Sequence, residues 1–230
     1  MVLEPDIGGV SIVLIGSMNP SIFSPDWFAR QGLISSAQAD DADVEILHRS
    51  IVQFKTGWLS VIVDRQRFQV MTTEPPYIRI CDFVVRLFRE CLPHAPISVV
   101  GINRDYHFNV STAAAREKIG RALAPPTAWG EWGEKFSSGE GEKHGGLRSI
   151  IMEYKNLDDR AHGHIHVRVE PSQQLLPWGV YIGINDHFDA SALPAEEQNV
   201  AVLSFLEKNF DASMARAESL ADQVLRLKDA

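Results

Sequence analysis

The chain has 230 residues, of which 45% are hydrophobic and 23% charged, and these are ordinary proportions for a globular protein with a buried core. They exclude a disordered, collagen-like or coiled-coil chain. The net charge of −8 disfavours a nonspecific nucleic-acid binder, because such proteins neutralise phosphates with an excess of Lys and Arg.

The first half of the sequence reads as a strand, a short helix, three strands and a second helix. Ser24 followed by Pro25 and Asp26 is typical of a helix start. Apolar residues at helical spacing indicate the second helix. The predicted elements are strand 10–17, helix 25–31, a polar connector 35–43, strands 44–55, 58–63 and 68–72, and helix 77–92.

The second half repeats this order. The predicted elements are strand 97–108, helix 109–123, a Gly-rich loop 127–146, strands 147–155, 162–170 and 179–185, and helix 195–227. The last helix carries a long apolar stripe that we expect to pack on the sheet. The alternative for this stripe is pairing with a second copy of the chain, which would make a homodimer.

Equal element orders in the two halves predict an internal duplication. Arg49-Ser50-Ile51-Val52 resembles Arg148-Ser149-Ile150-Ile151, which supports it. We therefore predict an α+β fold in a single domain, with two tandem β-α-β-β-β-α repeats over about 8–93 and 96–230. The strands should form a mostly antiparallel sheet with helices on one face and a polar, partly open second face.

This element order resembles that of the saddle of the TATA-box-binding protein. The chain also resembles a family of uncharacterised bacterial and archaeal proteins of about this length. The likeness lies in the hairpin 58–70, the Pro76-Tyr77 break, the helix residues 83–88 and the strand end Gly101-Ile102-Asn103-Arg104. It spans most of the chain and implies a fold, but no activity and no catalytic residues. The acidic charge, and the lack of the intercalating phenylalanine pairs of the TATA-binding type, disfavour DNA as a partner.

Three alternating histidines form the first candidate site. Alternate residues of a strand project from one face with Cβ atoms roughly 6–7 Å apart, a spacing from which imidazoles reach one Zn²⁺. A water on such an ion would be activated for hydrolysis. The alternatives are a polar, solvent-facing sheet surface that uses histidine and a pH-sensitive surface. The proposed ligands are His162, His164 and His166, with a further corner from His187, Glu153 or Asp186.

The Gly-rich segment and two polar clusters are the remaining candidates. The segment lacks the spacing of a phosphate-binding loop, so we expect it to order on a partner, with Trp129 and Trp132 as anchors. Asn103 and Arg104, and likewise Asn185, follow matching Gly-Ile pairs at predicted strand ends. Such clusters form either pseudo-symmetric binding sites or ordinary turns and caps.

The predicted helix 77–92 holds Cys81 and Cys91 about 15 Å apart, beyond the roughly 7 Å of a disulfide, so both are expected as buried thiols. No apolar run reaches the roughly 18 residues of a membrane span, and the start lacks a signal-peptide pattern. These features predict a cytoplasmic protein with no membrane partner.

No nucleophile elbow, C-x-x-C pair or H-E-x-x-H motif is present. We therefore predict a non-catalytic protein-interaction or scaffolding module, an accessory subunit of a multi-protein bacterial system, that needs no cofactor. The first alternative is a zinc-dependent hydrolase built on the alternating histidines. The second is a nucleic-acid-binding saddle.

Overall fold

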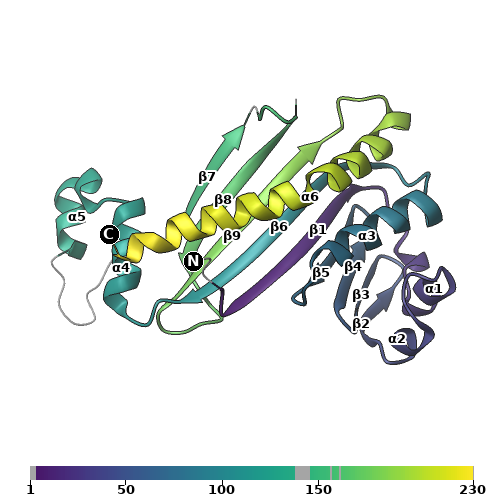
Figure 1. Ribbon diagram of the computed structural model, residues 1–230, viewed down its shortest axis with the longest axis horizontal. Helices are drawn as coiled ribbons and strands as arrows, with labels where there is room; N and C mark the ends of the chain where they lie inside the picture. Colours follow the sequence, from purple (N-terminus) through teal and green to yellow (C-terminus); the bar gives the residue numbers. More distant parts are fainter. Residues whose placement is uncertain (1–3, 138–145, 156, 161, 230) are drawn as a thin grey trace.

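The computed structural model describes residues 4–137, 146–155, 157–160 and 162–229. Its centre is a nine-stranded antiparallel sheet, counted over these described ranges, in the order β2-β3-β4-β5-β1-β6-β9-β8-β7 (Figure 1). The strands are β1 (Ile7–Gly16), β2 (Asp43–His48), β3 (Ile51–Thr56), β4 (Leu59–Asp64), β5 (Arg67–Thr72), β6 (Ile97–Asn109), β7 (Ile150–Lys155), β8 (Gly163–Pro171) and β9 (Gly179–Asp189).

The helices in the described residues are α1 (Pro25–Arg30), α2 (Ser36–Asp40), α3 (Ile78–Arg86), α4 (Ala113–Leu123), α5 (Gly130–Ser137) and α6 (Ala195–Arg226). Four of these six helices, α1, α3, α4 and α6, begin and end within a few residues of the predicted limits, and α2 and α5 were not predicted. Ser24 caps α1 by accepting a hydrogen bond from the Trp27 amide, as its sequence predicts. None of the helices in the described part of the chain has the length and apolar character of a membrane crossing.

The two halves share one sheet. In each half the first strand pairs with the last, β1 with β5 and β6 with β9, and β1 and β6 pair antiparallel with each other at the centre. This arrangement confirms the predicted α+β class and the antiparallel sheet.

Three local predictions were wrong. The predicted strand 44–55 is a hairpin, β2 and β3, whose turn is stabilised by a hydrogen bond from the Ser50 amide to His48 Nδ1. The predicted connector holds α2, which begins with a capping box between Ser35 and Gln38. Residues 127–137 of the predicted loop belong to a 3₁₀ turn and α5, while 138–145 lie outside the described residues.

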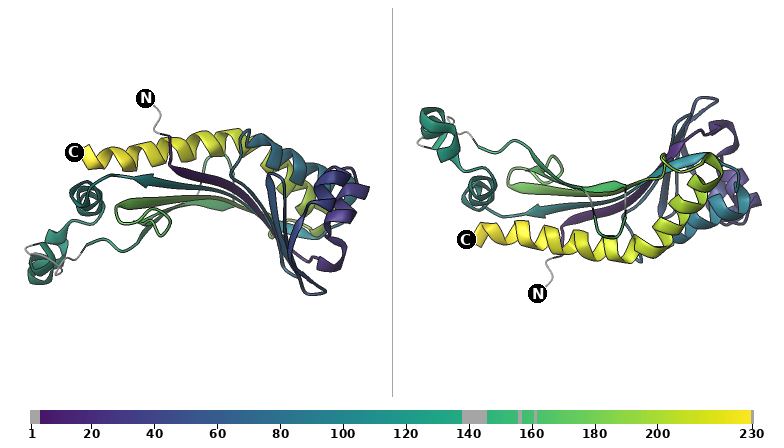
Figure 2. Two further views of the ribbon diagram at one scale, coloured as in Figure 1. Left: turned by 90° about the horizontal axis from the view of Figure 1, so that it is seen from below. Right: turned by 90° about the horizontal axis from the view of Figure 1, so that it is seen from above.

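Alternating side chains divide the sheet into two faces. On β1, Val10, Ile12 and Leu14 are fully buried under the helices, whereas Val13 and Ile15 point to the opposite face. Figure 2 shows the sheet curving away from α3 and α6, which lie on its convex side. We call the concave side, which these helices leave open, the uncovered face.

The last helix spans the cores of both halves. Val202, Leu206 and Phe210 belong to the core beneath α1 and α3, whereas Ala217 and Leu225 belong to the core of the second half. The apolar stripe of α6 is therefore occupied by the chain's own sheet. Its use for dimerisation stays untested.

The prediction of two buried thiols is confirmed for Cys81 and was wrong for Cys91, which is only partly buried. Cys81 is buried in α3 and Cys91 lies in the π-helical turn that continues it. Burial, aided by nearby carboxylates including Asp82, raises the pKa of the Cys81 thiol to about 12, so this thiol stays protonated and unreactive.

Candidate functional site

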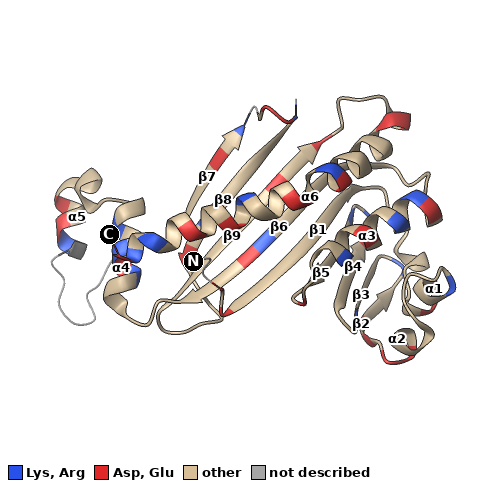
Figure 3. Ribbon diagram, in the orientation of Figure 1, with Lys and Arg blue, Asp and Glu red and all other residues tan. Residues whose placement is uncertain are grey.

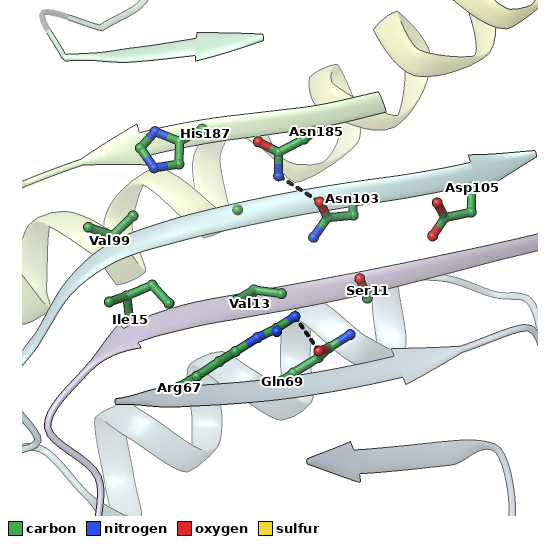
Figure 4. A pocket seen from close by; sticks show the side chains of 11 residues that line it. Ser11, Val13, Ile15, Arg67, Gln69, Val99, Asn103, Asp105, Asn185 and His187 are labelled. Atoms are coloured by element: carbon green, nitrogen blue, oxygen red, sulfur yellow. Dashed lines mark hydrogen bonds between the residues drawn. The ribbon is translucent and has the colours of Figure 1, made fainter. Parts of the chain in front are cut away.

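Two adjoining hollows mark the uncovered face, with volumes of about 390 and 330 Å³. They share Asn103, Asp105 and Asn185, and we call them together the trough. Figure 4 shows the first hollow, with side chains converging from β5, β1, β6 and β9. The side chains of the trough come from Ser11, Val13, Ile15, Arg67, Gln69, Val99, Asn103, Asp105, Ile151, His166, Arg168, Tyr181, Asn185 and His187.

Two glycines create the space. Gly101 lines the first hollow and Gly183 the second, each in the interior of a strand where a side chain would otherwise fill the face. A Cβ on Gly101 would lie 2.9 Å from Nδ2 of Asn185, and one on Gly183 would collide with the Tyr181 hydroxyl. Glycine inside a strand is typical of a place where a ligand or another backbone comes close.

The Gly-Ile-Asn segments of β6 and β9 meet at the centre of the trough. Asn103 lies directly opposite Asn185 in the register, and Asn185 Nδ2 donates a hydrogen bond of 2.6 Å to Asn103 Oδ1 (Figure 4). Gly101 is paired with His187, and Gly183 with Asp105, so the two segments are related by a local two-fold. They lie within the strands rather than at their ends, which removes the explanation by turns and caps.

Charges of both signs line the trough. The Tyr181 hydroxyl donates to Asp105 Oδ1 at 2.5 Å, and burial together with this bond raises the tyrosine pKa, so the hydroxyl stays a donor. Arg67 lies at one end, where its Nη2 donates to Gln69 at 2.5 Å, and Arg168 lies toward the other end. The surface thus offers both donors and acceptors.

Three imidazoles are stacked at the edge of the trough, and two of them, His166 and His187, line it. The His164 ring lies between those of His166 and His187, with centroid distances of 4.1 Å on each side. Burial and the neighbouring His166 lower the pKa of His164, and burial and His164 lower that of His187. Both rings therefore favour the neutral form, whose free nitrogen is a metal ligand or a hydrogen-bond acceptor.

Glu153 of β7 completes a cluster with two of these histidines. One donor atom each from Glu153, His164 and His166 lies within 4.8 Å of the other two. Glu153 Oε1 is 2.6 Å from His166 Nε2, and Oε2 is 2.7 Å from Nζ of Lys155. Bonds to Lys155 first and His166 second lower the pKa of Glu153 to about 2.

The structure distributes the other proposed ligands differently. His162 precedes β8 and is exposed, outside the cluster that the described residues form. Asp186 points to the helix-covered face, where it accepts hydrogen bonds from Arg160 and Arg216. Neither residue is placed to complete the site. Strand alternation directs Asp186 to the face opposite that of His187, and His162 lies outside the strand.

The remaining predicted binding residues also lie elsewhere. Arg104 faces the helices, where its guanidinium stacks on Tyr77 and Tyr106 and donates to the Gly9 carbonyl oxygen at 2.9 Å. Trp129 and Trp132 are 56% and 59% exposed, with ring centroids 5.5 Å apart, and neither lines the trough.

Sequence reasoning did not single out Asp105, Tyr181, Arg67 or Arg168 as members of one site. The available signal was alternation, which places Asp105, Tyr181 and Arg168 on the same strand faces as Asn103, Asn185 and His166. Arg67, on β5, alternates with the buried Phe68. Their meeting depends on strand pairing, which alternation does not reveal.

Comparisons with known proteins assign no family. No family model matches the sequence, and neither does any curated protein. Among solved structures the chain is similar to DynU16, a protein of the dynemicin biosynthetic locus, with 16% identity over 95% of this chain and 99% of that one. The TM-score is 0.25, which is too low to support an argument about fold or function.

Proposed function

We propose that the protein is a non-catalytic binding module whose trough receives an extended segment of a partner protein. The observation that carries this proposal is the pair of glycine-made hollows joined at Asn103 and Asn185, on the sheet face that the described helices leave open. Binding a partner without chemistry of its own fits an accessory subunit.

The amide side chains support a peptide as the ligand. Their mutual bond uses Asn185 Nδ2 and Asn103 Oδ1, which leaves Asn103 Nδ2 and Asn185 Oδ1 as a donor and an acceptor next to each other. A backbone peptide group offers the complementary acceptor and donor. Because the two segments are related by a local two-fold, this donor and this acceptor lie together at the middle of the trough.

The length of the trough also supports a polypeptide. Its lining extends over six neighbouring strands, from β5 to β7. At about 4.8 Å between strands this is roughly 24 Å, which an extended segment of about seven residues spans.

The charges favour a protein over a nucleic acid. Figure 3 shows acidic and basic residues interspersed along the strands and helices, and Asp105 lies in the middle of the trough. A phosphate backbone would be repelled by this carboxylate and by the net charge of −8. Acidic residues at the two ends of a bound segment would pair with Arg67 at one end of the trough and Arg168 at the other.

The test is selection of peptides from a random heptapeptide library displayed on phage, followed by calorimetry with the selected peptides. Asn103→Leu should weaken their binding by roughly tenfold or more, because a peptide group then loses its partner. Gly101→Leu should abolish binding by filling the first hollow. Gln223→Leu, an exposed amide on the opposite side of the molecule, is the matched control and should bind normally.

Circular dichroism would first establish that each variant folds. Failure to select any saturable peptide would contradict the proposal. Binding that is equally strong in Asn103→Leu and in the control would contradict it as well.

A further inference from the structure

The outer edge of the uncovered face holds a second site, distinct in chemistry from the trough. Glu153 lies opposite His166 in the register of β7 and β8, and His164 lies two residues earlier on the same face. Two paired strands therefore present one carboxylate and two imidazoles, and their donor atoms lie within 4.8 Å of one another.

We propose that Glu153, His164 and His166 bind a divalent transition metal ion, and that zinc is the best match. Imidazole nitrogen and carboxylate oxygen at about 2.0–2.2 Å are ordinary zinc ligands, and three protein ligands leave a fourth position open. His166 also lines the second hollow, so this position borders the trough. The proposal does not depend on peptide binding.

The required change in distance between the Glu153 and His166 ligand atoms is small. Ligands of a tetrahedral ion at these bond lengths are about 3.3 Å apart. The Glu153 and His166 atoms, now 2.6 Å apart, would separate by less than about 1 Å, and the His164 nitrogen would approach. The Glu153 and His166 side chains are 35% and 37% exposed, which leaves them room to turn.

The histidine stack limits the freedom of the central ligand. His164 is held between the His166 and His187 rings, the latter inclined by only 13°. A ring that is already oriented loses less entropy when it binds an ion. His187 is thus a positioning residue rather than a ligand.

Lys155 competes with the ion. Its ammonium lies 2.7 Å from Glu153 Oε2, so it satisfies the carboxylate and repels a cation. The lysine side chain is 62% exposed and can swing into water, but this competition lowers the affinity. A metal site therefore predicts that removing the lysine strengthens binding, an effect that a mere hydrogen-bond network would not produce.

The experiment is calorimetric titration of the full chain, purified without a histidine tag and stripped of metal, with zinc chloride. We expect one ion per chain. His164→Ala should weaken binding by more than about tenfold, since even the loss of a ligand's supporting group has an effect of roughly this size. Lys155→Met should strengthen it several-fold. His162→Ala, the neighbouring histidine outside the cluster, is the matched control and should bind like the wild type.

Two outcomes would overturn the proposal. One is the absence of saturable, one-to-one binding in the wild type. The other is an equal affinity of His164→Ala and His162→Ala. If His164→Ala does not fold, Glu153→Gln at the exposed sheet edge replaces it, and the same loss of affinity is expected.

Discussion

At the residue scale, His107 makes stability dependent on pH. It is buried on the uncovered side of β6, where its Nδ1 lies 2.8 Å from the Ser172 hydroxyl and its ring contacts that of Tyr181. Burial lowers its pKa below the ordinary 6.5, and the opposing effect of the Asp105 carboxylate is weaker. The folded state therefore binds a proton less readily than the unfolded chain does.

We expect the free energy of unfolding to decrease as the pH falls below about 6.5, because the unfolded chain then takes up protons first. His164 and His187, whose pKa values are also lowered, act in the same direction. His107→Gln should make the dependence shallower in urea denaturation at pH values of about 7.5 and 5.5. The matched control, His94→Gln at an exposed position, should keep the full dependence, and an unchanged slope in His107→Gln would refute this assignment.

At the element scale, β8 depends on the glycine with which it begins. Gly163 has φ +151°, and a Cβ there would collide with the carbonyl oxygen of His187 on β9. That oxygen belongs to the backbone of the neighbouring strand, so it cannot turn away as a side chain would. Gly163 thus allows β8 to pair closely with β9 and aligns His164 with His187.

Gly163→Ala should therefore destabilise the protein by about 1–3 kcal/mol, from backbone strain and the displaced strand. It should also weaken zinc binding, because the displaced strand carries His164. Thermal unfolding and the zinc titration measure the two effects. Gly9→Ala in β1, where a Cβ would make an ordinary contact at 3.5 Å, is the control, and an equal loss of stability in both variants would contradict the role of Gly163.

At the scale of the whole molecule, α6 and the β1–β6 pair join the two halves. The helix contributes to the core of each half, and β1 and β6 pair at the centre of the sheet in one register from Ile7 to Ile15. A loss of packing at one end of α6 should therefore also destabilise the half of the molecule at the other end.

Leu225→Ala tests this coupling. Leu225 is 3% exposed in the second core, and its truncation should cost about 2–5 kcal/mol. We expect amide hydrogen exchange to accelerate in β4 of the first half as well as in β9, measured by mass spectrometry. Loss of protection confined to β8 and β9 would mean that the halves unfold independently.

The sequence by itself determined the α+β class, most helix limits and the face on which each strand residue lies. His164 and His166 share a face because strand side chains alternate, and this requires no knowledge of the partner strand. Ser24 and Pro25 begin α1 for an equally local reason. The family resemblance and the duplication remain predictions, although the element orders are not equal: over the described residues the first half has five strands, β1 to β5, and the second has four, β6 to β9.

Only the tertiary structure decided which residues meet. Glu153 completes the histidine cluster because β7 pairs with β8 in one register, and Asn103 contacts Asn185 because β6 pairs with β9 across 82 residues. A register is chosen by hydrogen bonds and packing between distant segments, whereas alternation and capping act within a few residues. For this physical reason the sequence predicts which face of its strand a residue lies on, but it does not predict the trough.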